Sequence, residues 1–484
     1  MARIRQGKRR IPRRGDNGLV KAISLITLCL SVLLLLGNDN GKVYEDYKLL
    51  DKVTEAISDQ MWMSQTTTTK DDVSSIVKLD KDTTAVVTAS QSPLQQEEDT
   101  VIPATTASTT TTTTTSTIPT NATRINVAFD KNYKSPEWIY GPGVTVKIEP
   151  SHGTHRPEAD AVFCFSKYPT LPLLVRFVSS LLHTGYTGDI VIAIYPEMAD
   201  DVRDFIVYYT TAQQFHLVVY TVELTCQEMQ RRTRCIVENM FWSKNTYLVD
   251  SRPHREKAQL RFELYWAWSL SYSADSRIFL LDARDVYFQS NPFVLLDTRM
   301  NTSLHVFEEW GGRTIQEDRL NSLWVRSARG KEWLATIGDQ HVINSGTTVG
   351  GKPAIEMYLR AMVAQWDDTL CTIYGCYQGH VNILIHGDFL QGAPNLTKVV
   401  IHPQGTGVAN SVGAMALYAG GSLREQGVVD NVTNAILNND GRPSPVIHQF
   451  DLDEEMHLVF MIQRTNELLL EWNNTLMESR QQQK

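Results

Sequence analysis

Residues 277–293 read RIFLLDARDVYFQSNPF, and this stretch decides the fold. Residues 278–281 form an unbroken apolar run of strand length, which is typical of a strand buried on both faces of a parallel sheet. Asp282 stands at the C-terminal end of that run, and Asp285 follows three positions later. Open α/β sheets bind their ligands at the carboxyl ends of the strands. The stretch therefore predicts a buried strand that delivers two carboxylates to a ligand site.

Two carboxylates in a tight turn suit a divalent metal ion that also holds phosphate oxygens. Mn²⁺ and Mg²⁺ prefer oxygen ligands, and a cation at this place would neutralise a diphosphate leaving group. A structural alternative is that Asp282 caps the turn while Asp285 pairs with Arg284. The turn by itself leaves both interpretations open.

The sequence before this turn alternates apolar runs with helical patterns. Strands are predicted at 159–165, 190–195 and 216–222, and helices at 170–184, 200–215 and 254–272, the last of them amphipathic. Such alternation predicts a parallel sheet that is covered by helices on both faces. We therefore expect an α/β domain with an open, mostly parallel sheet over residues 125–475.

Four blocks together resemble the GT-A fold nucleotide-diphospho-sugar glycosyltransferases, over roughly residues 155–452. They are ADAVFCF at 159–165, the helix and metal strand at 256–293, INSGTTVGG at 343–351 and VIHQFD at 446–451. Their order and spacing carry the resemblance, since no single block does. It implies a type II membrane enzyme with a DxRD-like motif. That enzyme would use Mn²⁺ or Mg²⁺ to transfer a sugar, as a hexosyltransferase, from a nucleotide-diphosphate sugar to an acceptor hydroxyl.

The resemblance also implies roles for individual residues. Asp282, Asp285 and His448 would hold the metal, and Glu308 or Glu309 would take the acceptor proton. The donor would contact Arg261, Arg284, Asn344, Ser345, Gly346, Gln378 and Asn382. Each has a structural alternative: His448 as a core histidine, Arg261 as a structural cation, residues 344–346 as an ordinary turn, and the paired glutamates as solvated surface groups.

Two positions depart from the pattern of the resemblance. Arg284 stands where a strict Asp-x-Asp motif has its second acid, so either Asp285 takes that role or Arg284 holds phosphate directly and makes the metal dispensable. Tyr377 stands where related sequences carry an aspartate before the glutamine. The glycine-rich stretch 405–421 lacks the setting of a dinucleotide-binding loop, and we expect a mobile loop that could act as a lid.

The N-terminal region has the composition of a membrane anchor followed by a spacer. Residues 1–21 are a basic tail that we expect to be cytoplasmic, and 22–37 form an apolar stretch short enough to suit a thin bilayer. A cleaved signal peptide is the alternative, but no small-residue cleavage site follows. Residues 38–124 are rich in Ser and Thr and predict a disordered stalk. The positive-inside rule then places the catalytic domain in the lumen of the Golgi or ER.

Cysteines and sequons agree with a lumenal domain. Local disulfides are expected for Cys226 with Cys235 and for Cys371 with Cys376, which leaves Cys164 free in a strand. Glycosylation sequons begin at Asn121, Asn301, Asn395, Asn431 and Asn473. No basic stripe with interleaved aromatic residues follows the tail, which argues against nucleic acid as a partner.

The expected partners are a nucleotide-diphosphate sugar, a glycan or glycoprotein acceptor, and the membrane through the N-terminal helix. Two other classes remain open at this point. One is a non-catalytic carbohydrate-binding or cell-surface protein on the same fold. The other is a glycoside hydrolase with paired carboxylates, which would need neither metal nor nucleotide.

Overall fold

The computed structural model describes residues 144–146, 148–166, 169–211, 216–229, 232–238, 240–243, 252–297, 300–371 and 373–482. All of them belong to the second of the chain's two units, Thr117–Lys484. The predicted basic tail, membrane span and stalk at residues 1–124 lie outside the described residues. Within the described ranges, no helix has both the length and the apolar character that a membrane crossing needs.

The centre of the domain is a seven-stranded sheet in the order β12-β10-β11-β8-β2-β3-β4. Its strands are β2 (Ala161–Phe165), β3 (Asp189–Ile194), β4 (Leu217–Thr221), β8 (Arg277–Asp282), β10 (Ser303–Glu308), β11 (Ile343–Gly351) and β12 (Lys398–His402). Strands β8, β2, β3 and β4 pair in parallel, and β10 pairs in parallel with β12. Only β11 runs against its neighbours in this sheet. The expected open, mostly parallel α/β sheet is confirmed.

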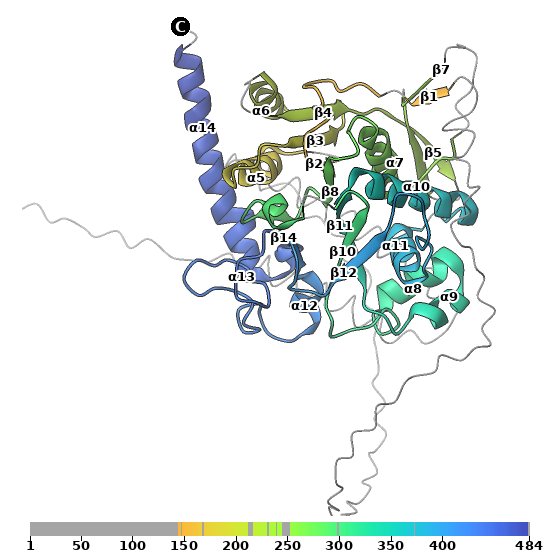
Figure 1. Cartoon of the computed structure of the whole chain (residues 1–484). Helices are drawn as coiled ribbons and strands as arrows, with labels where there is room; N and C mark the ends of the chain where they lie inside the picture. Colours follow the sequence, from red (N-terminus) through yellow and green to blue (C-terminus); the bar gives the residue numbers. More distant parts are fainter. Residues whose placement is uncertain are drawn as a thin grey trace, which may run out of the picture. The chain divides into compact units, whose positions relative to one another are not determined.

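Helices cover both faces of the sheet (Figure 1). They are α4 (Leu171–Leu174), η1 (Val175–Ser179), α5 (Ser180–His183), α6 (Asp200–Thr211), α7 (Lys257–Ser269), α8 (Arg319–Arg329), α9 (Lys331–Ile337), α10 (Lys352–Thr369), α11 (Cys376–His386), α12 (Gly413–Tyr418), α13 (Glu454–Met456) and α14 (Thr465–Gln482), with short turns η2 (Pro292–Leu295), η3 (Phe450–Leu452) and η4 (His457–Arg464). Alternate side chains of β2 divide between two cores: Phe163 packs with α7, α10 and α11, and Val162 with η1, α6 and α14.

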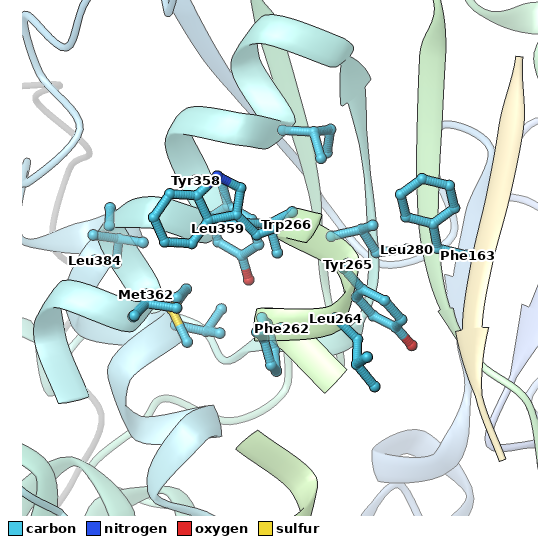
Figure 2. Close-up of a cluster of buried hydrophobic side chains, with 14 of the residues drawn as sticks. Phe163, Phe262, Leu264, Tyr265, Trp266, Leu280, Tyr358, Leu359, Met362 and Leu384 are labelled. Atoms are coloured by element: carbon cyan, nitrogen blue, oxygen red, sulfur yellow. The ribbon is translucent and has the colours of Figure 1, made fainter. Parts of the chain in front are cut away.

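Helix α7 lies in the middle of the first core. Figure 2 shows its side chains Phe262 and Tyr265 between Phe163 of β2 and residues of α10 such as Tyr358. The predicted amphipathic pattern is wrong here, because residues 259–269 are all buried. The polar members of this helix find partners inside the protein instead of water. One of them, Glu263, forms an ion pair of 2.8 Å with Arg255.

A small three-stranded sheet adjoins the central one, in the order β13-β14-β9. Its strands are β9 (Val286–Phe288), β13 (Ala409–Ser411) and β14 (Val446–His448). The stretch 405–421, expected to be a mobile loop, therefore contains β13 and α12 as regular elements. Two further pairs are β1 (Val144–Val146) with β7 (Phe241–Ser243), and β5 (Leu224–Met229) with β6 (Arg232–Val237).

The disulfide predictions are confirmed. Cys226 and Cys235 bridge β5 and β6, and Cys371 and Cys376 close the turn before α11. Cys164 is free and buried in β2.

The last helix, α14, packs on the second core through one aromatic residue. Trp472 lies 5.0 Å from Phe205, 5.2 Å from Tyr208 and 5.7 Å from Tyr209, measured between ring centroids. These three partners belong to α6, so the C-terminus of the domain completes a core that begins near residue 162.

Candidate active site

Three side chains from separate elements meet at the carboxyl end of β8. Asp282 is the last residue of β8, and Asp285 lies in the turn that leads to β9. Strand β14 pairs with β9 so that His448 is opposite Val286, beside Asp285. One ligand atom from each of Asp282, Asp285 and His448 lies within 4.8 Å of the others. We call these three residues the acid–imidazole triad.

Each carboxylate of the triad divides its two oxygens between an arginine and the imidazole. Asp282 accepts a hydrogen bond from Arg261 on Oδ1, while its Oδ2 lies 3.7 Å from Nε2 of His448. Asp285 accepts a bond of 2.9 Å from Arg284 on Oδ2, while its Oδ1 lies 3.4 Å from the same Nε2. The predicted Arg284–Asp285 pair is therefore present, yet it uses only one of the two oxygens. One oxygen of each acid remains turned toward His448.

The donor set fits a divalent cation such as Mn²⁺ or Mg²⁺. His448 is 1% exposed, and its Nε2 has no hydrogen-bond partner among the described residues. Its Nδ1 lies 3.1 Å from the hydroxyl of Ser411 on β13, a contact that fixes the ring orientation. The two carboxylate oxygens are ligands that Mn²⁺ and Mg²⁺ prefer, and the imidazole nitrogen would supply a third.

Gly346 keeps the space beside the triad open. A Cβ atom at this position would lie 2.5 Å from Oδ2 of Asp282 and 2.7 Å from Cε1 of His448. Both distances are too short for a real contact, so any larger residue would crowd the space between Asp282 and His448. Glycine is therefore needed at position 346 because the backbone of β11 lies so close to Asp282 and His448.

The charges around the triad keep both acids ionised. Burial acts against ionisation of Asp282, but Arg261 and His448 outweigh it and lower the pKa of its carboxyl. His448 and Arg284 likewise hold the pKa of Asp285 below its usual range against the effect of burial. Burial disfavours the charged imidazole, yet the two carboxylates raise the pKa of His448 to about 10. A cation that bound here would displace that proton.

Arg176 and Asp451, for which the sequence predicted no role in the site, complete this charge arrangement. Arg176 is 3% exposed on the π-helical turn η1, and its Nη2 donates a hydrogen bond to the carbonyl oxygen of Arg284. Asp451 accepts a bond of 2.6 Å from Nη1 of Arg284. Burial lowers the pKa of Arg176 to about 10, so the side chain stays charged at neutral pH. Its sequence signal was a single arginine within an otherwise apolar helical pattern.

A second cluster, Glu309 with Asn344 and Gln378, adjoins the triad. Glu309 follows β10, and its Oε1 accepts bonds of 3.1 Å from Asn344 Nδ2 and 3.5 Å from Gln378 Nε2. Asn344 Oδ1 in turn accepts a bond of 2.7 Å from the backbone N–H of Gly346. Burial, helped by the charge of Asp318, raises the pKa of Glu309 to about 7. We call these three residues the Glu309 cluster.

Other predicted residues have clear structural contacts. Glu308 Oε2 lies 3.2 Å from Nδ1 of His341, whereas Glu309 belongs to the cluster just described. Asn382 accepts a bond of 2.8 Å from the N–H of Ile343, and Gln378 accepts one of 2.9 Å from the N–H of Ser345. Both α11 side chains therefore hold the start of β11 in place.

Tyr377, at the position where the resemblance expects an aspartate, contacts Arg261. The guanidinium carbon of Arg261 lies 5.1 Å from the Tyr377 ring centroid. Arg261 is 9% exposed, and its Nη2 also approaches the carbonyl oxygen of Ser345 at 3.5 Å. The aromatic ring offers Arg261 a π face in place of a second carboxylate. Asp282 consequently remains the acid that pairs with Arg261.

The chain matches no protein-family model and no curated protein sequence. Among solved structures, matches include the galactosyltransferase LgtC in complex with donor and acceptor sugar analogues (TM-score 0.31, 10% identity, 60% of this chain and 86% of that chain). Another is the bifunctional glycosyltransferase WbbM (TM-score 0.36, 10% identity, covering 65% of this chain and 52% of that chain). A third is the glycosyltransferase GlyE of Streptococcus pneumoniae (TM-score 0.33, 12% identity, covering 66% of this chain and 64% of that chain). At such low scores this likeness does not decide the function, which depends on the geometry of the site.

Proposed function

We propose that this protein is a glycosyltransferase that moves a sugar from a nucleotide-diphosphate sugar to an acceptor hydroxyl on a glycan or glycoprotein. The observation that carries the proposal is the acid–imidazole triad at the carboxyl end of β8, where one oxygen of each acid and Nε2 of His448 face a common position. Mn²⁺ or Mg²⁺ held there would neutralise the negative charge of a leaving diphosphate.

The protein's own residues account for binding and orientation of the donor. Arg284 is 63% exposed in its side chain and lies next to Asp285, so it can reach a phosphate oxygen from the solvent side. Gly346 lets the backbone of β11 approach the donor without a side chain between them. Arg176 supports the turn between Asp282 and Asp285 by donating a hydrogen bond to the carbonyl oxygen of Arg284.

Glu309 is the best candidate for the base. A transfer with inversion requires a group that takes the proton of the acceptor hydroxyl as its oxygen bonds to the sugar. Glu309 is partly exposed, and its pKa of about 7 lies near the working pH, where a base is most effective. Asn344 and Gln378 fix the orientation of its carboxylate.

A non-catalytic carbohydrate-binding protein is a second candidate, which one observation favours. Arg261 already pairs with Asp282 and is held by Tyr377, so a cation would have to share Asp282 with it. Turnover separates the two candidates, because only the transferase releases nucleoside diphosphate from the donor when an acceptor is present.

The binding test is thermal unfolding with Mn²⁺ and a panel of nucleoside diphosphates, singly and together. A bound ligand stabilises the native state by RT ln(1 + [L]/Kd). We expect a large rise in Tm only when metal and one nucleotide are both present. Equal Tm values in all samples would contradict the proposal and would favour a hydrolase, which needs neither ligand.

We further propose that the chain is a type II membrane protein of the Golgi or ER with a lumenal catalytic domain. The basic tail, the apolar stretch 22–37 and the stalk 38–124 support this topology. N-terminal sequencing of membrane-extracted protein tests it. A mature N-terminus near residues 37–42 would show that a signal peptide had been removed instead.

A further inference from the structure

A cation–aromatic pair, Arg313 with Tyr418, connects two chain segments that each begin at a residue of the active site. The first leaves from Glu309 and reaches Arg313 in the loop after β10. The second leaves from Ser411, the partner of His448, and reaches Tyr418 at the end of α12. The guanidinium carbon of Arg313 lies 4.0 Å from the centroid of the Tyr418 ring. The pair therefore joins the loop after β10 to α12 beside the site.

Arg313 lies four residues after Glu309 in the loop that follows β10, and Tyr418 is close enough to Glu309 for their charges to interact. Burial raises the pKa of Tyr418; the charges of Asp318 and Glu309 add to the rise, and that of Arg313 opposes it. Asp318 is also the charge that raises the pKa of Glu309. The same acid therefore acts on both Tyr418 and Glu309, and Asp318 itself caps α8 by accepting a bond of 2.8 Å from the N–H of Asn321.

The guanidinium of Arg313 differs from the arginines beside the triad. Arg261 and Arg284 both donate hydrogen bonds to aspartates. Arg313 is half-buried, and in the described part of the chain its side chain makes no hydrogen bond or ion pair. Stacking on Tyr418 orients the planar group while its N–H edges remain available. An oriented guanidinium with free donors matches the geometry of a carboxylate or a sulfate.

We propose that Arg313, held by Tyr418, binds an anionic group of the acceptor, so that the acceptor is an acidic sugar bearing a carboxylate or a sulfate. This inference rests on the proposed transferase function. The position of the pair beside Glu309 assigns the anion to the acceptor, since Glu309 is the group that takes the acceptor proton. Arg284, next to Asp285, is the exposed cation for the donor phosphates.

The experiment compares acidic and neutral glycosides that share one aglycone. Protein loaded with Mn²⁺ and the nucleoside diphosphate that raises Tm is titrated with p-nitrophenyl β-glucuronide, β-galacturonide, α-sialoside and 6-sulfated β-galactoside, and with the neutral β-glucoside and β-galactoside, by saturation-transfer NMR. We expect at least one acidic glycoside to bind about tenfold more tightly than its neutral counterpart, because charge-assisted bonds to a fork of donors are stronger than neutral ones.

Variants then attribute the preference to Arg313. Arg313→Ala is expected to remove the preference and leave nucleotide affinity unchanged, whereas Arg313→Lys retains part of it because the charge remains without the fork. Tyr418→Leu should weaken it by releasing the guanidinium. Arg203→Ala, at an exposed ion pair on α6, is the matched control and should change nothing.

The outcomes separate this inference from the proposed function. If no acidic glycoside binds better than its neutral counterpart, or if Arg313→Ala keeps the preference, the acidic-acceptor inference is wrong while the nucleotide result stands. A loss of nucleotide affinity in Arg313→Ala would assign Arg313 to the donor instead and also overturn it. If the wild type shows no Tm change with metal and nucleotide, the transferase proposal itself fails.

Discussion

The acid–imidazole triad and the Glu309 cluster hold carboxylates in opposite electrostatic settings. Asp282 and Asp285 each pair with an arginine and face His448, and the pKa of both acids is lowered. Among the described residues, the Glu309 carboxylate has only the neutral amides of Asn344 and Gln378 as hydrogen-bond partners, and its pKa is raised to about 7. Nearby cations keep the first two acids charged at neutral pH, whereas burial raises the pKa of the third so that it can gain and lose a proton near neutral pH. Carboxylates separated in this way can divide the work between holding charge and moving protons.

The largest effect is expected when one carboxylate of the acid–imidazole triad loses its charge. Asp282→Asn keeps the size of the side chain but removes the charge that faces His448. We expect turnover to fall by about a thousandfold, because neutralisation of the leaving diphosphate contributes several kcal/mol and about 1.4 kcal/mol is a factor of ten. Turnover is measured for both proteins with Mn²⁺ and with a chelator.

The same assay on Arg284→Ala guards against a metal-free alternative. If Arg284 neutralised the diphosphate by itself, its loss would be the more damaging change and the chelator would leave the wild type unaffected. Near-wild-type turnover in Asp282→Asn would equally rule out a metal held by this acid.

The role of Glu309 as a base is tested with Glu309→Gln. The amide can still accept the bond from Asn344 but cannot take a proton, so turnover should fall by about a hundredfold or more. In the wild type, kcat/KM should rise with pH and level off above about 7, because Glu309 acts as a base only when deprotonated and its pKa is raised to about 7.

Measuring kcat/KM from pH 5.5 to 9 for both proteins tests this rise, which we call the acidic limb of the pH profile. Asp318 and His448 are the charged groups that act on Glu309, in opposite directions, so Asp318→Asn should shift the limb to lower pH. Persistence of the same limb in Glu309→Gln would show that another group is titrating.

A smaller effect is expected when space is removed without any change of charge. In Gly346→Ala the added Cβ would lie 2.5 Å from Oδ2 of Asp282, so Mn²⁺ affinity should fall about tenfold or more. The residues of the acid–imidazole triad and of the Glu309 cluster are unchanged in this variant. Electron paramagnetic resonance of free Mn²⁺ during a titration measures the affinity, and the Tm without metal shows whether the fold is intact. Unchanged affinity would mean that the cation does not occupy the space beside Gly346.

The smallest effect is expected at Arg176, whose hydrogen bond to the site goes to the backbone of Arg284. Arg176→Met keeps much of the length but loses the bond to the carbonyl oxygen of Arg284. We expect the KM for Mn²⁺ to rise by about tenfold or less with little change in kcat at saturating metal, and Arg176→Lys should restore part of the loss. A change confined to Tm, with the KM for Mn²⁺ unaltered, would reduce Arg176 to a structural cation.

Four of the seven strands of the central sheet, β2, β3, β4 and β8, could be predicted from the sequence, because each is an apolar run of strand length. The strand of residues 278–281 is an example, since burial on both faces leaves no polar position within it. The pattern failed for α7, whose polar residues Gln259, Arg261 and Glu263 are buried with partners from other elements. Local periodicity cannot reveal which polar groups will find partners after folding.

The site could be predicted only in part for a related reason. Asp282 and Asp285 were visible at a strand end, and His448 through the resemblance. Ser411 gave no local signal, and Arg176 gave only that of a single arginine in an apolar helical pattern. Strands β13, β14 and β9 have three residues each and lie far apart in the chain, so their pairing is set by tertiary packing. The separation of Glu308 from Glu309 also depends on packing, because β10 ends at Glu308 and the Glu309 carboxylate is placed by its bonds to Asn344 and Gln378.

The small sheet β13-β14-β9 determines when the site can be completed during synthesis, because its strands are made at different times. Asp282 and His448 are 166 residues apart (448 minus 282), so at about 5–20 residues per second the two acids wait on the order of ten to thirty seconds for their histidine. Trp472, which covers Phe205 and Tyr209, is added still later. A growing chain therefore exposes both an unfinished site and an open apolar face until its last helix has emerged. Truncation before β14 would leave a protein that carries most of its sheet but no complete site.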